Sequence, residues 1–287
     1  MAASSICLAD PAGRFLWLIP LADPATNVPA MRLPVLNAAA YRFVSLADTA
    51  LVRKRLFGHA LALGLKGTVL LADEGINLCI AGPTVAVREW LAALQADTRF
   101  ADLAAKESFS ADVPFRNLVV KVKREIIRMN HPTIRPEAGR APAVDAATLA
   151  RWLDAGVDDI GRPVVMLDTR NAFEVDAGRF RGALDWRIGK FSEFPEAALA
   201  HRNDLRGKTV VSYCTGGIRC EKAALFMAES GAENVLQLDG GILRYLEEVG
   251  GRHFDGSCFV FDERETLDDA LAPMRPPART DHPERST

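Results

Sequence analysis

The sequence has no apolar run long enough to cross a bilayer, few cysteines and almost no net charge. A membrane-spanning helix needs about 20 apolar residues. The apolar segment at residues 15–20 is short and follows no basic segment, so neither a membrane span nor a signal peptide is predicted. The five cysteines are odd in number and irregularly spaced, which argues against a disulfide framework and indicates a reducing, cytoplasmic compartment. With a formal net charge of -2, any nucleic-acid contact must come from a local basic patch.

The stretch with the clearest chemical signature covers residues 213–223, Tyr-Cys-Thr-Gly-Gly-Ile-Arg-Cys-Glu-Lys-Ala. It lies between a predicted buried strand and a predicted helix. Backbone N–H groups converge at such a helix N-terminus, and together with the helix dipole they favour a cysteine thiolate over the thiol. Cys214 is therefore the candidate active-site residue, and Arg219 adds fixed positive charge that stabilises an anion. The loop amides expected to surround the sulfur belong to Thr215, Gly216, Gly217 and Ile218.

Three interpretations of this loop are open. A buried structural cysteine is disfavoured, because two glycines and an arginine beside it serve no apolar packing. A phosphatase loop also surrounds an anion with a cysteine and an arginine, but it needs a longer gap between them to encircle a phosphate. Here four residues separate Cys214 from Arg219. The tighter ring favours the third interpretation, a loop that holds a single sulfur atom on the cysteine as a persulfide.

Strands and helices alternate in the second half of the chain, which predicts an α/β domain with a largely parallel sheet. The expected strands cover residues 164–168, 183–187, 209–213 and 235–238, and the expected helices cover residues 145–155, 194–201, 221–230 and 242–248. In such sheets ligands bind at the carboxyl ends of the strands. Cys214 is expected at one of these ends.

The first half of the chain shows a β-α-β-β-α-β order with one extra strand, which predicts a ferredoxin-like α+β domain. Its expected strands cover residues 40–48, 67–72, 76–80, 106–110 and 117–127, and its expected helices cover residues 49–65 and 83–96. The last strand alternates Val120 and Val122 with basic residues. A solvated outer face is one interpretation of this alternation; a local phosphate-binding stripe is the other. The basic residues proposed to contact RNA are Lys121, Lys123 and Arg124.

The ends of the chain and one central segment carry little pattern. Residues 1–36 are rich in alanine and proline and are expected to be a poorly patterned extension, or a stretch ahead of a translation start at Met31. Residues 130–142 contain three prolines and a glycine, which predicts a linker between domains. After Phe261 the pattern is lost, and prolines with interspersed charges indicate a disordered tail.

The second domain resembles a rhodanese domain, a family in which the loop cysteine carries sulfur as a persulfide. Three features carry the resemblance: Cys-x-x-x-x-Arg after a strand, Asp168-x-Arg170 at an earlier strand end, and Glu174 followed by Gly178. A structural salt bridge with a helix cap is the favoured role of Asp168 and Arg170, with support of the active site as the alternative. The predicted domains are a ferredoxin-like (acylphosphatase-like) domain over residues 37–129, a rhodanese domain over 143–255 and a C-terminal segment over 256–287.

The chain as a whole resembles the tRNA uridine(34) hydroxylase family over roughly residues 36–265. The similarity lies in the cysteine loop, in residues 67–77 (Gly-Thr-Val-Leu-Leu-Ala-Asp-Glu-Gly-Ile-Asn), in residues 115–129 and in residues 258–264. It implies oxygen-dependent hydroxylation of the wobble uridine of tRNA at C5, with Cys214 as the active residue and tRNA as the partner. It also implies O2 and a reductant as co-reactants.

Loop chemistry by itself predicts sulfur transfer to tRNA, a protein or a small acceptor, and a non-catalytic binding module is a further alternative. No His/His/carboxylate set for iron and no flavin-binding motif is present, so no metal or cofactor is predicted. Cys220 lies in the first turn of the expected helix. This position predicts a lowered thiol pKa and a role as a resolving thiol; packing beneath the loop is the alternative.

Overall fold

The computed structural model describes residues 7–9, 15–17 and 35–274, which fall into two compact units, residues 1–33 and 34–287. In the first unit, β1 (Cys7–Ala9) pairs antiparallel with β2 (Phe15–Trp17). The rest of the predicted N-terminal extension up to residue 34 lies outside the described residues. No helix in the described part of the chain is long and apolar enough to cross a membrane.

The first half of the second unit is the expected ferredoxin-like fold. Its five-stranded sheet has the order β6-β3-β5-β4-β7, antiparallel except between β4 and the extra strand β7. Its elements are β3 (Val35–Phe43), α1 (Thr49–Ala62), β4 (Lys66–Ala72), β5 (Gly75–Pro83), α2 (Thr84–Gln95), β6 (Lys106–Ser110) and β7 (Leu118–Val122).

The first and last strands differ most from the sequence-based prediction. The first strand begins at Val35 rather than at residue 40, because Val35 and Leu36 already pair with both β5 and β6. The last strand ends at Val122 rather than at residue 127. Beyond it, the Ile126 amide donates to the Glu74 carboxylate instead of to a neighbouring strand. Val120 is buried as expected, but Val122 is exposed.

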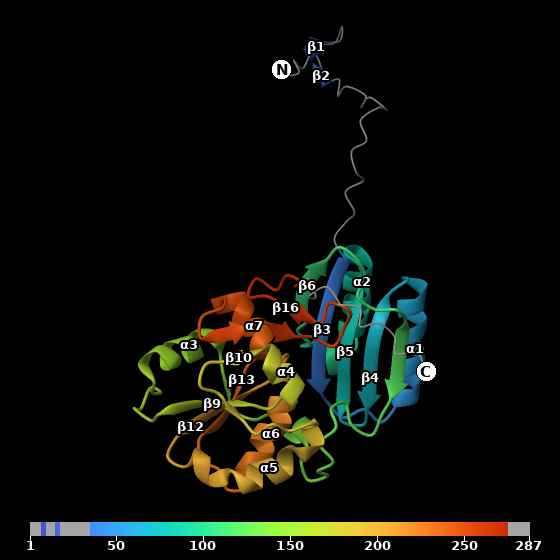
Figure 1. Cartoon of the computed structure of the whole chain (residues 1–287). Helices are drawn as coiled ribbons and strands as arrows, with labels where there is room; N and C mark the ends of the chain where they lie inside the picture. The colour runs from blue at the N-terminus through green and yellow to red at the C-terminus, as the bar shows by residue number, and fades with distance from the viewer. Residues whose placement is uncertain (1–6, 10–14, 18–34, 275–287) are drawn as a thin grey trace, which may run out of the picture. The chain divides into compact units, whose positions relative to one another are not determined.

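The two helices of this domain cover one face of its sheet and leave the other face free of helices (Figure 1). Along β3 the residues alternate between the two faces, as the pleat requires. Leu36, Ala38 and Ala40 belong to the core beneath α1 and α2. The opposite face of β3 therefore carries Asn37, Ala39 and Tyr41, with partly or fully buried side chains. These residues are covered by the second domain.

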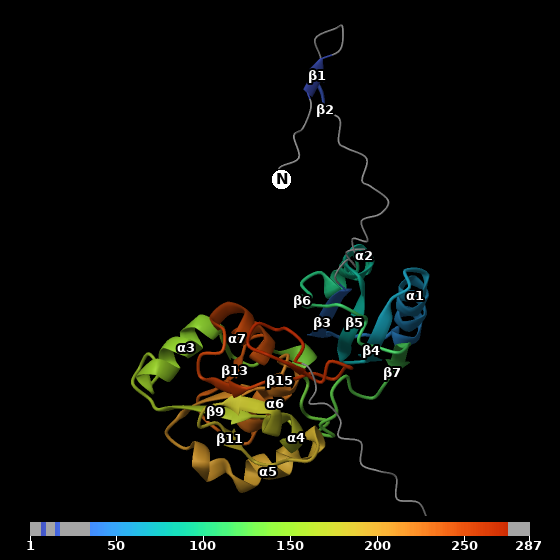
Figure 2. The ribbon, with the colours of Figure 1, turned by 45° about the horizontal axis from the view of Figure 1, so that its top comes forward.

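The second half of the unit contains the expected parallel sheet, with the order β11-β9-β12-β13-β8. Helices α3 and α7 lie on one face, and α5 and α6 lie on the other (Figure 2). The elements are β8 (Ala143–Val144), α3 (Ala146–Ala155), β9 (Val164–Asp168), α4 (Ala172–Ala177), β10 (Gly178–Phe180), β11 (Leu184–Asp185), α5 (Phe194–Ala200), β12 (Thr209–Tyr213), α6 (Ile218–Glu229), β13 (Val235–Leu238), α7 (Gly241–Val249) and β14 (Phe254–Gly256).

The segment after Phe261 is more ordered than the sequence indicated. β15 (Cys258–Phe259) pairs antiparallel with β16 (Thr266–Leu267), and Leu267 is buried. Arg264 donates to the Asp262 carboxylate and to the Ser108 hydroxyl of β6. The prediction of a disordered tail is thus wrong for residues 262–274. Charged side chains in this segment form ion pairs with each other, and Arg264 also forms a hydrogen bond to the first domain. Residues 275–287 lie outside the described part.

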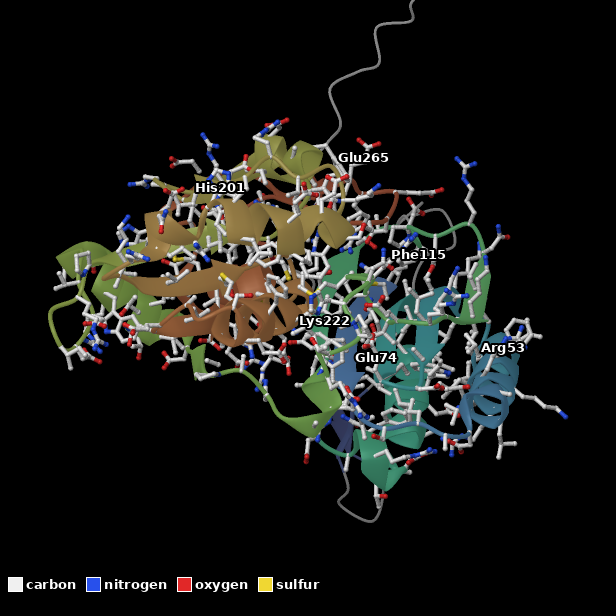
Figure 3. All side chains as sticks on the ribbon, turned by 90° about the horizontal axis from the view of Figure 1, so that it is seen from below. Arg53, Glu74, Phe115, His201, Lys222 and Glu265 are labelled. Atoms are coloured by element: carbon white, nitrogen blue, oxygen red, sulfur yellow. The ribbon has the colours of Figure 1, made fainter. Side chains whose placement is uncertain are left out.

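A buried cation connects the two halves of this unit. Lys222 of α6 is 2% exposed, and its ammonium group lies 2.7 Å from Glu74 and 2.8 Å from Glu125 (Figure 3). Its Nζ also donates to the Ile127 carbonyl. A buried charge is tolerated only when it is paired and hydrogen-bonded. The arrangement therefore holds the N-terminal half of α6 against the β4–β5 turn of the first domain.

Replacing Lys222 by Met is expected to lower the free energy of unfolding by about 3 kcal/mol, because two carboxylates would then face each other without a cation. Urea unfolding of the full chain measures this change. Arg88→Met, which removes an exposed pair with Glu107, is the matched control and should cost less than about 1 kcal/mol. Equal effects of the two substitutions would contradict a structural role for the buried cation.

Candidate active site

The Cys214 loop connects the end of β12 to the start of α6. The helix begins at Ile218, three residues earlier than predicted, so Arg219 and Cys220 both lie in its first turn. The Cys214 sulfur accepts a hydrogen bond from the Gly217 amide at 3.1 Å. Among the described contacts, the amides of Thr215, Gly216 and Ile218 make no hydrogen bond to this sulfur. The cradle is therefore formed by Gly217 and the helix start rather than by every amide of the loop.

Cys214 is held as a thiolate. Its burial alone would raise the pKa, but the Cys220 thiol, the positive charge of Arg219 and the amides of Cys220 and Arg219 outweigh that cost and lower the pKa of Cys214 to about 5. At neutral pH the side chain is an anion, which is the form that acts as a nucleophile. The lowered pKa predicted from the strand-loop-helix position is confirmed.

Cys220 behaves differently from the prediction. Burial and the neighbouring Cys214 raise its thiol pKa well above the usual value. Its Sγ donates to the Gly217 carbonyl at 2.8 Å. The predicted lowering of the Cys220 pKa is wrong. The start of α6 stabilises the Cys214 thiolate, and this negative charge makes ionisation of the neighbouring Cys220 thiol unfavourable. Cys220 thus supports the loop as a protonated donor.

Arg219 directs its hydrogen bonds away from the sulfur. Its guanidinium forms two bonds to the Glu174 carboxylate, at 2.6 and 2.7 Å, and both side chains are buried. Such a bidentate pair fixes the plane of the guanidinium. Arg219 therefore acts on Cys214 through its charge, while Glu174 holds it in place. The sequence signal for Glu174 was its place in the rhodanese-like motif, followed by Gly178, but nothing local indicated its partner.

Asp168 and Arg170 form the structural salt bridge that was predicted. Both side chains are fully buried, and the Arg170 Nη2 lies 2.7 Å from the Asp168 carboxylate. Arg170 also donates to the Gly178 carbonyl at 2.6 Å. Neither residue lines the cavity at Cys214. The pair connects the end of β9 to the start of β10 beneath the loop.

The N-terminus of α7 supports the loop from the other side. The amides of Ile242 and Leu243 donate to the carbonyls of Cys214 and Thr215, both at 3.0 Å. This approach is possible because residue 241 is glycine: a Cβ there would lie 2.4 Å from the Cys214 carbonyl oxygen. Gly241 also has a φ of +67°, in the left-handed region that glycine tolerates best. The backbone of the cysteine loop is thus fixed by a second helix.

A cavity of about 540 Å³ opens beside Cys214. One wall is the cysteine loop, a second is the free sheet face of the first domain, and a third is the C-terminal segment that contains Phe261. Sequence reasoning missed the contribution of the first domain. The residues lining that wall include Asn37, Ala39, Tyr41, Thr68, Cys79 and Lys106.

The predicted RNA-contacting residues lie elsewhere. Lys121, Lys123 and Arg124 are exposed, on or just beyond the edge strand β7. None of them lines the cavity at Cys214, whereas Arg128 does.

Comparison with known proteins agrees with both domains. A family model described as the UPF0176 acylphosphatase-like domain matches residues 35–126, and a rhodanese-like domain model matches residues 146–248. Three relatives are each named tRNA uridine(34) hydroxylase. That of Bordetella avium is 64% identical, covering 84% of this chain and 100% of the relative. Those of Bordetella petrii and Variovorax paradoxus are 66% and 65% identical, covering 83% and 81% of this chain and 95% and 89% of the relatives. The chain belongs to the tRNA uridine(34) hydroxylase family.

In this member of the tRNA uridine(34) hydroxylase family the described thiols differ sharply in acidity. Burial raises the pKa of Cys79 to about 11 and that of Cys258 to about 12. Among Cys79, Cys214, Cys220 and Cys258, Cys214 alone is thus ionised at neutral pH. The described residues contain no cluster of His, Cys, Asp and Glu that could hold a metal ion.

Alkylation of Cys214 by iodoacetamide is expected to have a midpoint near pH 5, with the rate rising as pH rises, because the reactive thiolate is lost below its pKa. Peptide mass spectrometry across pH 4–9 measures this site separately. Arg219→Met should raise the midpoint, whereas Arg181→Met, which removes an exposed charge paired with Asp255, should leave it unchanged. A midpoint near the ordinary thiol pKa in the unaltered protein would contradict the cradle.

Proposed function

We propose that this protein hydroxylates the wobble uridine of tRNA at C5, giving 5-hydroxyuridine, with Cys214 at the reacting centre. The observation that carries the proposal is a thiolate opening onto a cavity of about 540 Å³ in a member of this family. Cavities that bind small molecules have volumes of this size. A base inside a stacked anticodon loop cannot reach a buried sulfur, so the uridine would enter the cavity flipped out of the stack.

A thiolate serves this chemistry as a nucleophile. Addition of the Cys214 sulfur to C6 of uracil forms an S–C6 bond and moves the C5–C6 π electrons toward C5 and O4. C5, the position that receives oxygen, becomes electron-rich. O2 and a reductant are both implied by the family resemblance. C5 would form a bond to one oxygen atom of O2, and two electrons from the reductant, with protons from solvent, would break the O–O bond and release the other oxygen atom as water. Elimination of the sulfur with loss of a C5 proton then restores the ring.

Rhodanese-type sulfur transfer is the second candidate function. The observation that favours it is the short loop itself, in which the Gly217 amide contacts the sulfur directly. A persulfide on Cys214 would place its outer sulfur in the cavity. The acceptor could then be tRNA, a protein or a small molecule, and a thiolated nucleoside would identify the first case.

The proposed partner is tRNA, and the proposed compartment is the cytoplasm. Lys121, Lys123 and Arg124 remain the predicted phosphate contacts, and their exposure on one edge of the first domain supports this role. Phosphate contacts of this kind set the position of an RNA without identifying a base. Recognition of the uridine would therefore belong to the cavity.

Nucleoside mass spectrometry of tRNA from a deletion strain carrying either the unaltered gene or Cys214→Ala tests the proposal. We expect 5-hydroxyuridine and its derivatives with the unaltered gene and none with Cys214→Ala, because the nucleophile is missing. Equal protein levels and matching unfolding curves control for folding. Loss of a thiolated nucleoside instead would favour sulfur transfer. Unchanged tRNA in all strains would favour a non-catalytic module or a small-molecule acceptor.

A further inference from the structure

The cavity wall supplied by the first domain contains a buried acceptor without a partner. Asn37 is 4% exposed and lines the cavity. Its Nδ2 donates to the Ser108 carbonyl at 3.3 Å and to the Ser110 hydroxyl at 2.9 Å. Its Oδ1 has no hydrogen-bond partner in the described structure. Because a buried polar atom left unpaired is costly, this oxygen indicates a ligand that offers an N–H group.

A cation lies beside Asn37 on the same sheet face. Lys106 of β6 is in register with Ala39, one row along from the Asn37–Ser108 pair. Its ammonium lies 5.4 Å from the centre of the Tyr41 ring, and the described contacts include no carboxylate paired with it. Side chains diagonal to each other across two strands lie about 7–8 Å apart at their bases. Asn37 and Lys106 therefore stand one row apart on the same face of the sheet.

The row that contains Lys106 continues across the sheet with small side chains. Ala39 is in register with Cys79 of β5, which is in register with Thr68 of β4. All three line the cavity. A row of small residues on a sheet leaves a shallow slot on which a planar base can lie.

The reactive sulfur lies toward the opposite end of this slot. Tyr41 is four residues beyond Asn37 on the same face, which is about 13 Å along the strand. Its hydroxyl donates to Glu221 at 3.0 Å. A Cβ on Gly217 would lie 2.9 Å from that hydroxyl oxygen, so Tyr41 contacts the cysteine loop. The cavity therefore extends from Asn37, past Lys106, to the loop that contains Cys214.

We propose that Asn37 and Lys106 recognise the pairing edge of the wobble uracil. Asn37 Oδ1 accepts the N3–H, and Lys106 Nζ donates to the O4 carbonyl. N3 and C6 are opposite corners of the ring, so this pose turns the C5–C6 edge toward Cys214. Cytosine has no N3–H and carries an amino group at C4, so both contacts exclude it. The assignment rests on the proposed function, since it names the residues that select that substrate.

Binding of anticodon stem-loops to the full chain tests this recognition without requiring turnover. The probes carry uridine, 3-methyluridine or cytidine at position 34. The unaltered protein should bind uridine about 5- to 150-fold more tightly than 3-methyluridine, which lacks the N3–H. In Asn37→Ala the ratio should fall to about 1, because the acceptor is gone and the methyl group has room. Ser110→Ala removes one of the two Nδ2 partners and the bond to the Asp112 carbonyl but leaves Oδ1 in place, so it should keep the ratio of the unaltered protein.

Lys106→Met gives an independent measurement if Asn37→Ala does not fold. It should reduce the preference for uridine over cytidine, and Lys106→Arg should restore much of it.

Equal binding of uridine and 3-methyluridine by the unaltered protein, or an unchanged ratio in Asn37→Ala, would overturn the inference and leave water as the partner of Asn37. Nucleoside mass spectrometry on the same variants separates the two proposals. Absence of 5-hydroxyuridine with normal base discrimination would reject the hydroxylation and retain the recognition.

Discussion

The structure is organised around one buried anion, the Cys214 thiolate. Removing a charge from water is unfavourable unless hydrogen bonds and opposite charge replace the solvent. The start of α6 supplies amides, Cys220 supplies a protonated thiol, and Arg219 supplies charge. Other contacts hold these groups in place: Glu174 fixes the Arg219 guanidinium, and the N-terminus of α7 fixes the loop carbonyls. Together these contacts keep the Cys214 sulfur ionised, and therefore nucleophilic, at neutral pH.

The first domain completes the cavity at Cys214. Its helix-free sheet face closes the cavity, and two contacts hold it against α6: the Tyr41 hydroxyl on Glu221 and the carboxylates on Lys222. A rhodanese loop alone provides a reactive sulfur but few groups to select a base. The sheet adds a slot, an acceptor and a cation, which explains how a loop suited to sulfur chemistry can serve a reaction on uracil.

The cysteine loop could be predicted from the sequence because its chemistry is local: a strand, two glycines and a helix start follow one another along the chain. Both domain folds followed from the alternation of strands and helices. Asn37, Tyr41 and Lys106 could not be assigned, because their role arises from the packing of two domains. The predicted strand also began at residue 40, which hid the alternation of Asn37 with Leu36 and Ala38. The hairpin after Phe261 was missed because paired charges such as Asp262 and Arg264 resemble a solvated segment.

The claim that matters most is that the two domains form one pocket for the target base. A crystal structure of the Cys214→Ala protein bound to a uridine-34 anticodon stem-loop tests it most directly. The account predicts the uracil flipped into the cavity, with N3 within hydrogen-bonding distance of Asn37 Oδ1 and the C5–C6 edge facing residue 214. A uracil left stacked in the anticodon loop, or bound on the β7 edge away from the cavity, would contradict it.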